Sequence, residues 1–171
     1  MTPVSILEPM PAPSSERRDD IGRLVAVTWH GSAVSGNKRW LVAVDGSECS
    51  LRAVAMAARL SALGRDGEID IGHVQPWLVK EAAETELARR GWAATTQARE
   101  LLDSASVGWH LYVVMGEAAT QIVGLADTPG FDGIKGIVIG SRGQSVLKAL
   151  MLGSVAEEIV HQAKLPVMIV R

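Results

Sequence analysis

The stretch GIVIGSRGQSVLKALMLGSVAEEIV, residues 136–160, joins a strand-like run that ends at Gly140 to a helix-like run through a loop with two further glycines, Gly143 and Gly153. Its apolar start, 136–140, is typical of a strand buried on both faces. Simple connections between a strand and a helix usually take about two to six residues, whereas residues 141–153 separate these two runs. A loop of this length raises the question whether it has a binding function or is a plain connection.

Strands and helices alternate along the rest of the chain, which predicts an α/β fold with a parallel sheet and helices on both faces. Right-handed crossovers leave few topologies, and we expect the flavodoxin-like one, an open five-stranded sheet of order 3-2-1-4-5 with the first strand central. The predicted strands are 40–45, 69–74, 107–115, 136–140 and 166–170, and the predicted helices run from Ser47 to about Leu63, Val79 to Ser104, Glu117 to Ala126 and Ser154 to Ala163.

Residues 1–38 form an N-terminal extension before the predicted domain at 39–171. Its first twenty residues carry four prolines among Ser, Glu, Arg and Asp, a composition typical of a flexible tail. RLVAVTWH (23–30) resembles a strand, and 31–37 a turn. Because 40–45 is expected to have a parallel neighbour on each side, residues 23–30 must go to a sheet edge or lie across the outside.

The bulk properties exclude several classes of protein. The chain has 171 residues, which suits one domain with a real core, and its net charge of −2 gives no footprint for nucleic acid or an anionic membrane. Its apolar runs are strand-sized, and the N-terminus does not resemble a signal peptide. The single cysteine, Cys49, cannot form an internal disulfide. These features fit a reducing cytosol.

The glycine loop has the spacing Gly140, two residues, Gly143, nine residues, Gly153, Ser154. Glycines allow a ligand to approach the backbone, and successive N–H groups can form an anion-binding nest. Ser154 starts a predicted helix, whose free N–H groups and dipole favour phosphate, and Arg142 adds a positive charge. The nine-residue insert, 144–152, can pack as a short helical flap. The spacing alone leaves two interpretations open, a polyphosphate cradle or a glycine-capped loop without a ligand.

This loop resembles the ATP-binding motif of the universal stress protein family, in which Gly, two residues, Gly, nine residues and Gly precede Ser or Thr. Four further stretches are similar to that family in the same order, so the resemblance covers about residues 40–171. They are VAVDGSECSLRA (42–53), GHV (72–74), VVMGEAATQI (113–122) and KLPVMIV (164–170). The long segment before residue 40 departs from the family's usual start, and Ala118 stands where the family often has proline.

The resemblance implies a flavodoxin-like sheet and, in the branch with the complete glycine motif, bound ATP with Mg²⁺. It implies that Asp45 lies at the nucleoside end and that Val74 meets adenine through its backbone. The implied contacts are Ala43 and Val44 to the base, Gly116 near the ribose, and Gly140, Arg142, Gly143, Gly153, Ser154 and Val155 to the phosphates.

Three functions remain open at this stage. The first is a cytoplasmic, ATP-binding regulator of the stress response whose nucleotide state changes contact with a protein partner that the sequence does not identify. The second is a slow ATPase or autophosphorylating enzyme. Catalysis would need a base, and Asp45 is the only acidic residue expected at the crevice, so any hydrolysis should be slow. The third is a nucleotide-free dimeric interaction domain.

By the same resemblance, two subunits meet at the strand 166–170. We therefore predict a homodimer with this strand at its interface and with residues 23–30 packed at or near it, on the same or on the partner subunit, where Trp29 supplies buried area. The alternative is a disordered tail with a chance apolar patch.

Other signals predict no chemistry. GSAVSGNK (31–38) imitates a P-loop, but Asn37 interrupts the motif and a strand follows where a helix is required. The four histidines, at positions 30, 73, 110 and 161, have no metal-ligand spacing, so we interpret them as structural. Cys49 is expected to be a small core or boundary residue. We therefore predict no catalytic and no metal-ligating residues.

Overall fold

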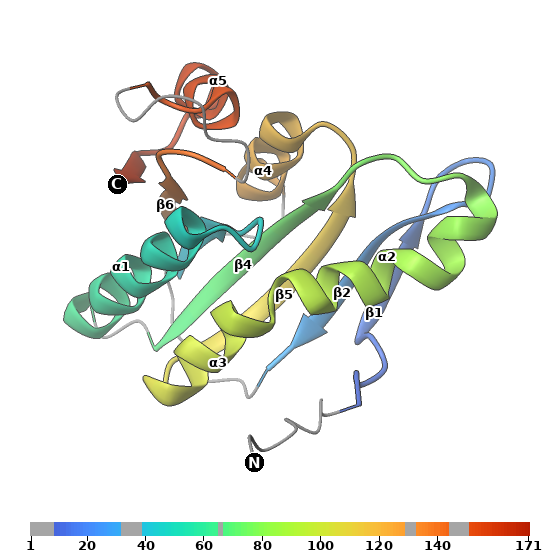
Figure 1. Cartoon of the computed structure of the whole chain (residues 1–171), viewed down its shortest axis with the longest axis horizontal. Helices are drawn as coiled ribbons and strands as arrows, with labels where there is room; N and C mark the ends of the chain where they lie inside the picture. The colour runs from blue at the N-terminus through green and yellow to red at the C-terminus, as the bar shows by residue number, and fades with distance from the viewer. Residues whose placement is uncertain (1–8, 32–38, 65–66, 129–132, 144–150) are drawn as a thin grey trace, which may run out of the picture.

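The computed structural model describes residues 9–31, 39–64, 67–128, 133–143 and 151–171. None of the helices in these ranges is long and apolar enough to cross a membrane. The strands are β1 (Ser15–Arg18), β2 (Leu24–His30), β3 (Arg39–Ala43), β4 (Glu68–Gln75), β5 (Gly108–Met115), β6 (Ile134–Gly140) and β7 (Val167–Val170). The helices are α1 (Glu48–Gly64), α2 (Lys80–Ala94), α3 (Thr96–Ser104), α4 (Ala118–Asp127) and α5 (Ser154–Gln162) (Figure 1).

The strands form one mixed sheet of seven, in the order β1-β2-β5-β4-β3-β6-β7. The five strands from β5 to β7 pair in parallel, with β3 in the middle. This part of the sheet confirms the predicted flavodoxin-like order. The two strands of the N-terminal extension add to it by antiparallel pairing.

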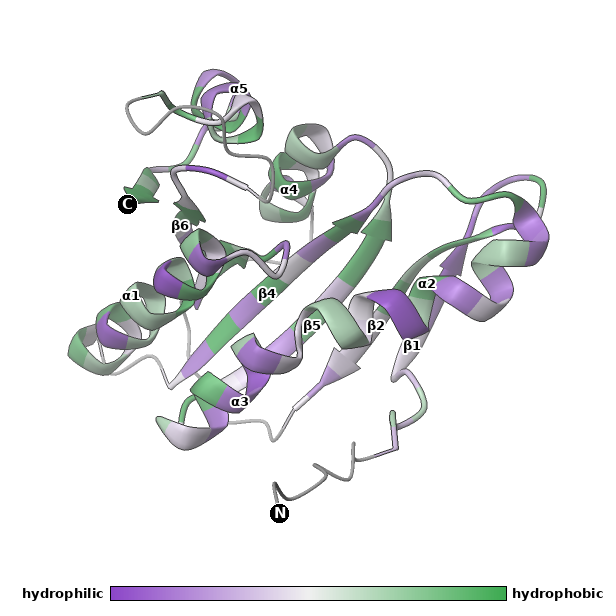
Figure 2. Cartoon of the chain, in the orientation of Figure 1, coloured by the Kyte–Doolittle hydropathy of each residue, from purple (hydrophilic) through white to green (hydrophobic). Residues whose placement is uncertain are grey.

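Helices cover both faces of the sheet and create two cores. Buried residues of α1, α2 and α3 pack on one face, and buried residues of α4 and α5 pack on the other. Strand β4 alternates between hydrophobic and hydrophilic residues in Figure 2. Its isoleucines, Ile69 and Ile71, lie in the first core, whereas both oxygens of its buried carboxylate Asp70 lie 3.0 Å from Arg39 Nε and share its one N–H in a bifurcated hydrogen bond. The sheet therefore carries a polar cluster near the amino end of β4.

The extension strand β2 joins the edge of the five-stranded part opposite to the one predicted, and β1 then lies outside it. Strand β2 pairs with β5, whereas β7 is the last strand at the far side. The expected edge position is confirmed, but its placement beside 166–170 is wrong within this chain. One physical reason is length, since β5 offers eight residues to the seven of β2, and β7 offers only four.

The side chain of Trp29 is buried within its own chain and is not exposed for contact with another subunit. Its side chain is 3 % exposed, and its ring lies 5.2 Å from that of Trp92 on α2. The indole Nε1 donates a hydrogen bond of 3.0 Å to the carbonyl of Pro11. The prediction that Trp29 supplies area to a subunit interface is therefore wrong.

Part of the predicted flexible tail is ordered as β1, which pairs with β2. The charged side chains of this strand are exposed, and Arg18 forms an ion pair with Glu84 of α2. Lys80 of α2 also donates to the carbonyl of Ile21 at 2.9 Å. Backbone pairing and these contacts order a segment whose composition favoured a tail. A short, charged edge strand also protects the sheet against further strand addition.

The single helix predicted from Val79 to Ser104 is two helices, α2 and α3, which meet at Thr95. The Thr95 hydroxyl donates to the carbonyl of Gly91 at 2.9 Å, and the residue is fully buried. Threonine side chains that bond to the backbone in this way compete with regular helix geometry. Arg99 then lies over the Trp92 ring at 3.5 Å, across the junction.

Candidate functional site

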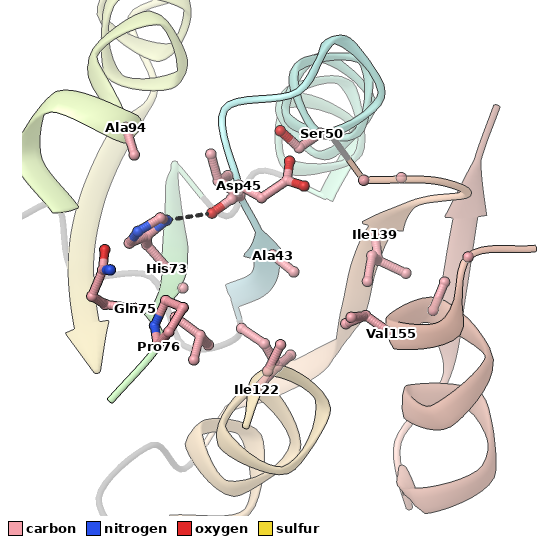
Figure 3. Close-up of a pocket in the computed structure, with 18 of the residues that line it drawn as sticks. Ala43, Asp45, Ser50, His73, Gln75, Pro76, Ala94, Ile122, Ile139 and Val155 are labelled. Carbon is pink, nitrogen blue, oxygen red and sulfur yellow. Dashed lines mark hydrogen bonds between the residues drawn. The ribbon is translucent and has the colours of Figure 1, made fainter. Parts of the chain in front are cut away.

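A cavity of about 640 Å³ lies at the carboxyl ends of β3, β4 and β6. In an open parallel sheet this is where ligands bind, at the point where the strand order reverses. Figure 3 shows Ile122, Ile139 and Val155 on one side of the cavity and His73, Gln75 and Ala94 on the other. The lining residues are Ala43, Val44, Asp45, Ser50, Gly72, His73, Val74, Gln75, Pro76, Arg89, Arg90, Ala93, Ala94, Ala118, Ile122, Ile139, Gly140, Arg142, Gly143, Gly153, Ser154, Val155 and Ala156.

Strand β4 runs further toward the cavity than its neighbour β3. The last bond between the two joins Val44 N to Gly72 O at 2.9 Å, whereas Gln75 O accepts from Gly116 N, beyond β5, at 3.0 Å. Peptide groups of a parallel strand point to its two sides in alternation. The peptide N–H and C=O of Val74 are therefore directed toward the space beyond the end of β3.

His73 holds the ends of β3 and β4 together beneath the cavity. Its Nδ1 lies 2.8 Å from the carbonyl oxygen of Val44, and the side chain is almost fully buried (Figure 3). Burial lowers the pKa of His73, against the opposing effect of the Val44 carbonyl. The neutral ring therefore donates a hydrogen bond from Nδ1, and its role is structural.

The glycines of the loop provide space rather than an unusual backbone conformation. None of Gly140, Gly143 and Gly153 has a positive φ, so glycine matters at these positions because it lacks a Cβ. A Cβ at Gly140 would come within 2.7–2.8 Å of the backbone and Cβ of Cys49 on α1. A Cβ at Gly143 would lie 2.8 Å from Asp45 Oδ2, and one at Gly153 would lie 3.3 Å from Ser141 O. Gly140 is thus required by packing, whereas Gly143 keeps room beside a carboxylate.

Helix α5 begins at the cavity without a side-chain cap. Its N-cap residue is Gly153, which has no side chain, and among the described residues no side chain accepts from its first turn, whereas Glu117 caps α4 through Ala119 N and Thr120 N. In α1, Ser47 Oγ accepts from Ser50 N at 3.2 Å, as its predicted capping role requires. The first N–H groups of α5 therefore face the cavity available for an anion.

The structure brings together all the site residues predicted from the sequence except Gly116. That glycine, with φ +142°, forms the turn between β5 and α4, and a Cβ there would meet the Gln121 side chain at 2.8 Å. Gly116 therefore has a conformational role in this structure. The predicted flap falls mostly outside the described residues, as do the predicted turn at 31–37 and nearly all of the P-loop imitation.

Helix α2 contributes a wall of the cavity that was not predicted from the sequence. Arg89, Arg90, Ala93 and Ala94 line the cavity from this helix. Glu86 forms ion pairs with both arginines, and hydrogen bonds from Arg89 and then Arg90 lower the pKa of Glu86 to about 2. No local motif marks these residues, because their place depends on how α2 packs across β4 and β5. Within the described ranges, no group of three or more His, Cys, Asp and Glu side chains is arranged to hold a metal ion.

The model of the universal stress protein family matches residues 36–171. The chain belongs to this family. Universal stress protein YxiE of Bacillus subtilis (strain 168) is 31 % identical over 149 residues, which cover 78 % of this chain and 98 % of the relative. The family match begins after β2, so the N-terminal strands precede the shared region.

Solved universal stress proteins have the same fold. One from Archaeoglobus fulgidus covers 78 % of this chain and 98 % of its own, with a TM-score of 0.64 and 23 % identity. A universal stress protein in complex with cAMP covers 80 % and 98 %, with a TM-score of 0.59 and 25 % identity. A universal stress protein from Archaeoglobus fulgidus in complex with dAMP covers 78 % and 98 %, with a TM-score of 0.61 and 22 % identity. Adenine nucleotides are therefore ligands of related structures.

Proposed function

We propose that this universal stress protein is a cytoplasmic ATP-binding regulator whose nucleotide state changes its contact with other proteins. The observation that carries the proposal is the convergence of Gly143, Gly153 and the uncapped start of α5 on one cavity. Related structures with bound cAMP and dAMP support an adenine nucleotide. In this proposal Arg142, Ser154 and the N–H groups of α5 hold the phosphates, with Val155 and Gly140 completing that end of the cavity.

The proposal places adenine beside β4. The peptide N–H and C=O of Val74 can pair with the donor and acceptor groups of the base, because β3 ends before it can use them. Ala43, Val44 and Ile122 supply apolar cavity surface for the ring. This arrangement requires no side chain to recognise the base.

Asp45 supports the presence of Mg²⁺ with the nucleotide. Its Oδ1 accepts from Ser47 N at 2.9 Å, and its Oδ2 faces Gly143 of the phosphate loop. A carboxylate beside phosphate would repel it unless a cation lay between them. Mg²⁺ is commonly held by one or two carboxylates together with phosphate oxygens and water. In this proposal Asp45 holds the ion, which revises two expectations from the sequence, namely that Asp45 lies at the nucleoside end and that no residue ligates a metal.

Nucleotide that co-purifies with the protein would test the proposal directly. The purified protein is boiled, and the supernatant is analysed by anion-exchange chromatography and mass spectrometry. We expect ATP or its breakdown products in amounts approaching one per chain. If no adenine nucleotide is released and added ATP does not bind, the proposed nucleotide function is wrong.

Ser154→Ala is expected to weaken ATP binding while leaving adenosine binding nearly unchanged. A hydroxyl hydrogen bond to a charged phosphate oxygen contributes about 1.5–3 kcal/mol, so ATP affinity should fall roughly ten-fold or more. Isothermal titration with ATP and with adenosine measures both effects. Equal losses for the two ligands would remove Ser154 from the phosphate end.

We also propose a homodimer through β7, with α5 as the link to the nucleotide. The outer edge of β7 has no partner strand in the seven-stranded sheet. Ile169 on this strand and Val160 on α5 are 38 % and 44 % exposed. Because α5 begins at Ser154 in the cavity and carries Val160, a phosphate held at its start can shift the surface beside β7. This geometry supports a nucleotide-dependent interface.

Ile169→Lys is expected to convert the dimer to a monomer. The substitution introduces a charge at the exposed apolar edge, where it would have to be buried against the same charge of a second subunit. Light scattering at a fixed protein concentration measures the mass. Leu63→Lys is the matched control, because Leu63 is 84 % exposed at the end of α1. A dimer that survives Ile169→Lys would place the interface elsewhere.

A further inference from the structure

Two histidines far apart in the sequence meet where the extension joins the family's sheet. His30, the last residue of β2, lies opposite His110 of β5 in the strand register. Their Nδ1 atoms are 3.1 Å apart, and their rings cross at 71°. His30 is exposed, so the space beside the pair opens to solvent. The pair lies near the amino end of β4, away from the cavity at the carboxyl ends of the strands.

A buried carboxylate supports the ring of His110 from behind. Glu68 of β4 is 3 % exposed, and its Oε2 lies 3.4 Å from His110 Nε2. A contact of this length is long for a hydrogen bond but orients the ring. Histidines that bind metals almost always donate their other ring N–H to a carboxylate, a carbonyl or water. With a proton on Nε2, the Nδ1 lone pair of His110 points toward His30.

We propose that His30 and His110 chelate a divalent transition-metal ion through their Nδ1 atoms. Two zinc–nitrogen bonds of about 2.0–2.1 Å at a tetrahedral angle place the nitrogens about 3.3–3.4 Å apart, close to the observed separation of 3.1 Å. Imidazole nitrogen suits Zn²⁺, Ni²⁺ and Cu²⁺. Among the described residues, no third His, Cys, Asp or Glu side chain is placed to complete a metal site. In this proposal the protein therefore supplies two ligands, and water fills the remaining coordination positions.

The proposed ion would fasten the extension to the family's sheet. Beyond His30, Gly31 N donates a backbone hydrogen bond of 2.9 Å to Trp109 O of β5. The described residues of this segment end at Gly31. A metal bound by one residue from β2 and one from β5 adds a link at this end. Because the ion binds only when the strands are paired, it should stabilise the folded state.

Zn²⁺ titration of chelator-treated protein, without nucleotide, tests the proposal by calorimetry. Wild type is compared with His30→Ala and His110→Ala, and with His161→Ala as the matched control, since His161 is exposed on α5. We expect one Zn²⁺ per chain, affinity losses of at least about ten-fold in the first two variants, and no change in the control. Zn²⁺ should also raise the melting temperature of wild type and of His161→Ala only.

Two results would overturn the proposal. One is the absence of Zn²⁺ binding by wild type, and the other is binding that survives both His30→Ala and His110→Ala. Either would mean that the pair is only a hydrogen bond between strands. Glu68→Gln tests the positioning role, with an expected affinity loss of about 10–100-fold. Its circular dichroism spectrum shows whether the fold is retained. The experiment does not depend on ATP, so the proposed nucleotide function can fail without affecting it.

Discussion

Gly143→Val is expected to abolish ATP binding while leaving the fold intact. A Cβ at this position would lie 2.8 Å from Asp45 Oδ2, and the larger valine side chain would occupy the space between the carboxylate and the glycine loop. The proposed site needs this space for phosphate and Mg²⁺. The contact is with the end of a side chain, which can move aside, so the backbone of β3 and β6 need not shift.

The choice of glycine decides what the experiment reports. Gly140→Val would collide with the backbone of Cys49 at 2.7–2.8 Å, so it would test the packing of α1 on β6 rather than the ligand. Gly153→Val is a less clean second variant, because its Cβ would lie 3.3 Å from backbone atoms of Ser141 and Arg142, so the loop itself would have to shift. Gly124→Ala is the matched control, since an added Cβ on that residue of α4 meets nothing within 4 Å.

Isothermal titration with Mg²⁺–ATP measures the effect, and far-UV circular dichroism verifies the fold. We expect wild-type affinity for Gly124→Ala and no measurable binding for Gly143→Val. A folded Gly143→Val protein that binds ATP as tightly as wild type would show that the phosphates lie elsewhere. The proposal would then be wrong about the loop even if nucleotide co-purifies.

The five-stranded part of the sheet could be predicted because its strands are buried apolar runs separated by helices. Right-handed crossovers then leave few orders, and the predicted one is observed. The edge taken by 23–30 could not be predicted, because an apolar run fits any uncovered edge. The choice depends on tertiary features, namely the eight-residue length of β5 and the Trp92 side chain that α2 places over β2.

Some residues of the candidate site could likewise be predicted from the sequence, and others could not. The glycine loop and Asp45 follow directly from strand ends, so local sequence was sufficient to bring them to one cavity. The α2 wall depends on the break at Thr95 and on the packing of Gly91 against Val113. His30 and His110 are separated by 80 residues, and only the antiparallel pairing of β2 with β5 brings them together. No spacing rule applied to the sequence could reveal that pair.

Trp29→Ala is expected to destabilise the protein strongly, because the extension strand belongs to the core. Trp29 is 3 % exposed and contacts Trp92, and its Nε1 donates to Pro11 O. Replacing a buried tryptophan by alanine typically lowers the free energy of unfolding by about 3–5 kcal/mol, because apolar contacts are lost and a cavity remains. A disordered tail would show no such loss.

Trp77→Ala is the matched control for this effect. Trp77 is 58 % exposed, and the guanidinium carbon of Arg23 lies 4.8 Å from the centre of its ring. Exposed cation–π contacts contribute about 0.5–1 kcal/mol, so the control should lose no more than that. Urea denaturation compares the variants, at one protein concentration because the stability of a dimer depends on it.

Mass measurement separates the two roles that Trp29 could have. Strand β2 lies at the opposite side of the sheet from β7, so Trp29→Ala should leave the mass unchanged at low temperature, where the variant remains folded. A tryptophan at a subunit interface would give the reverse result, a lower mass with little loss of monomer stability. If Trp29→Ala costs no more than Trp77→Ala, β2 does not pack on α2, and the proposed metal link between β2 and β5 would lose its structural basis as well.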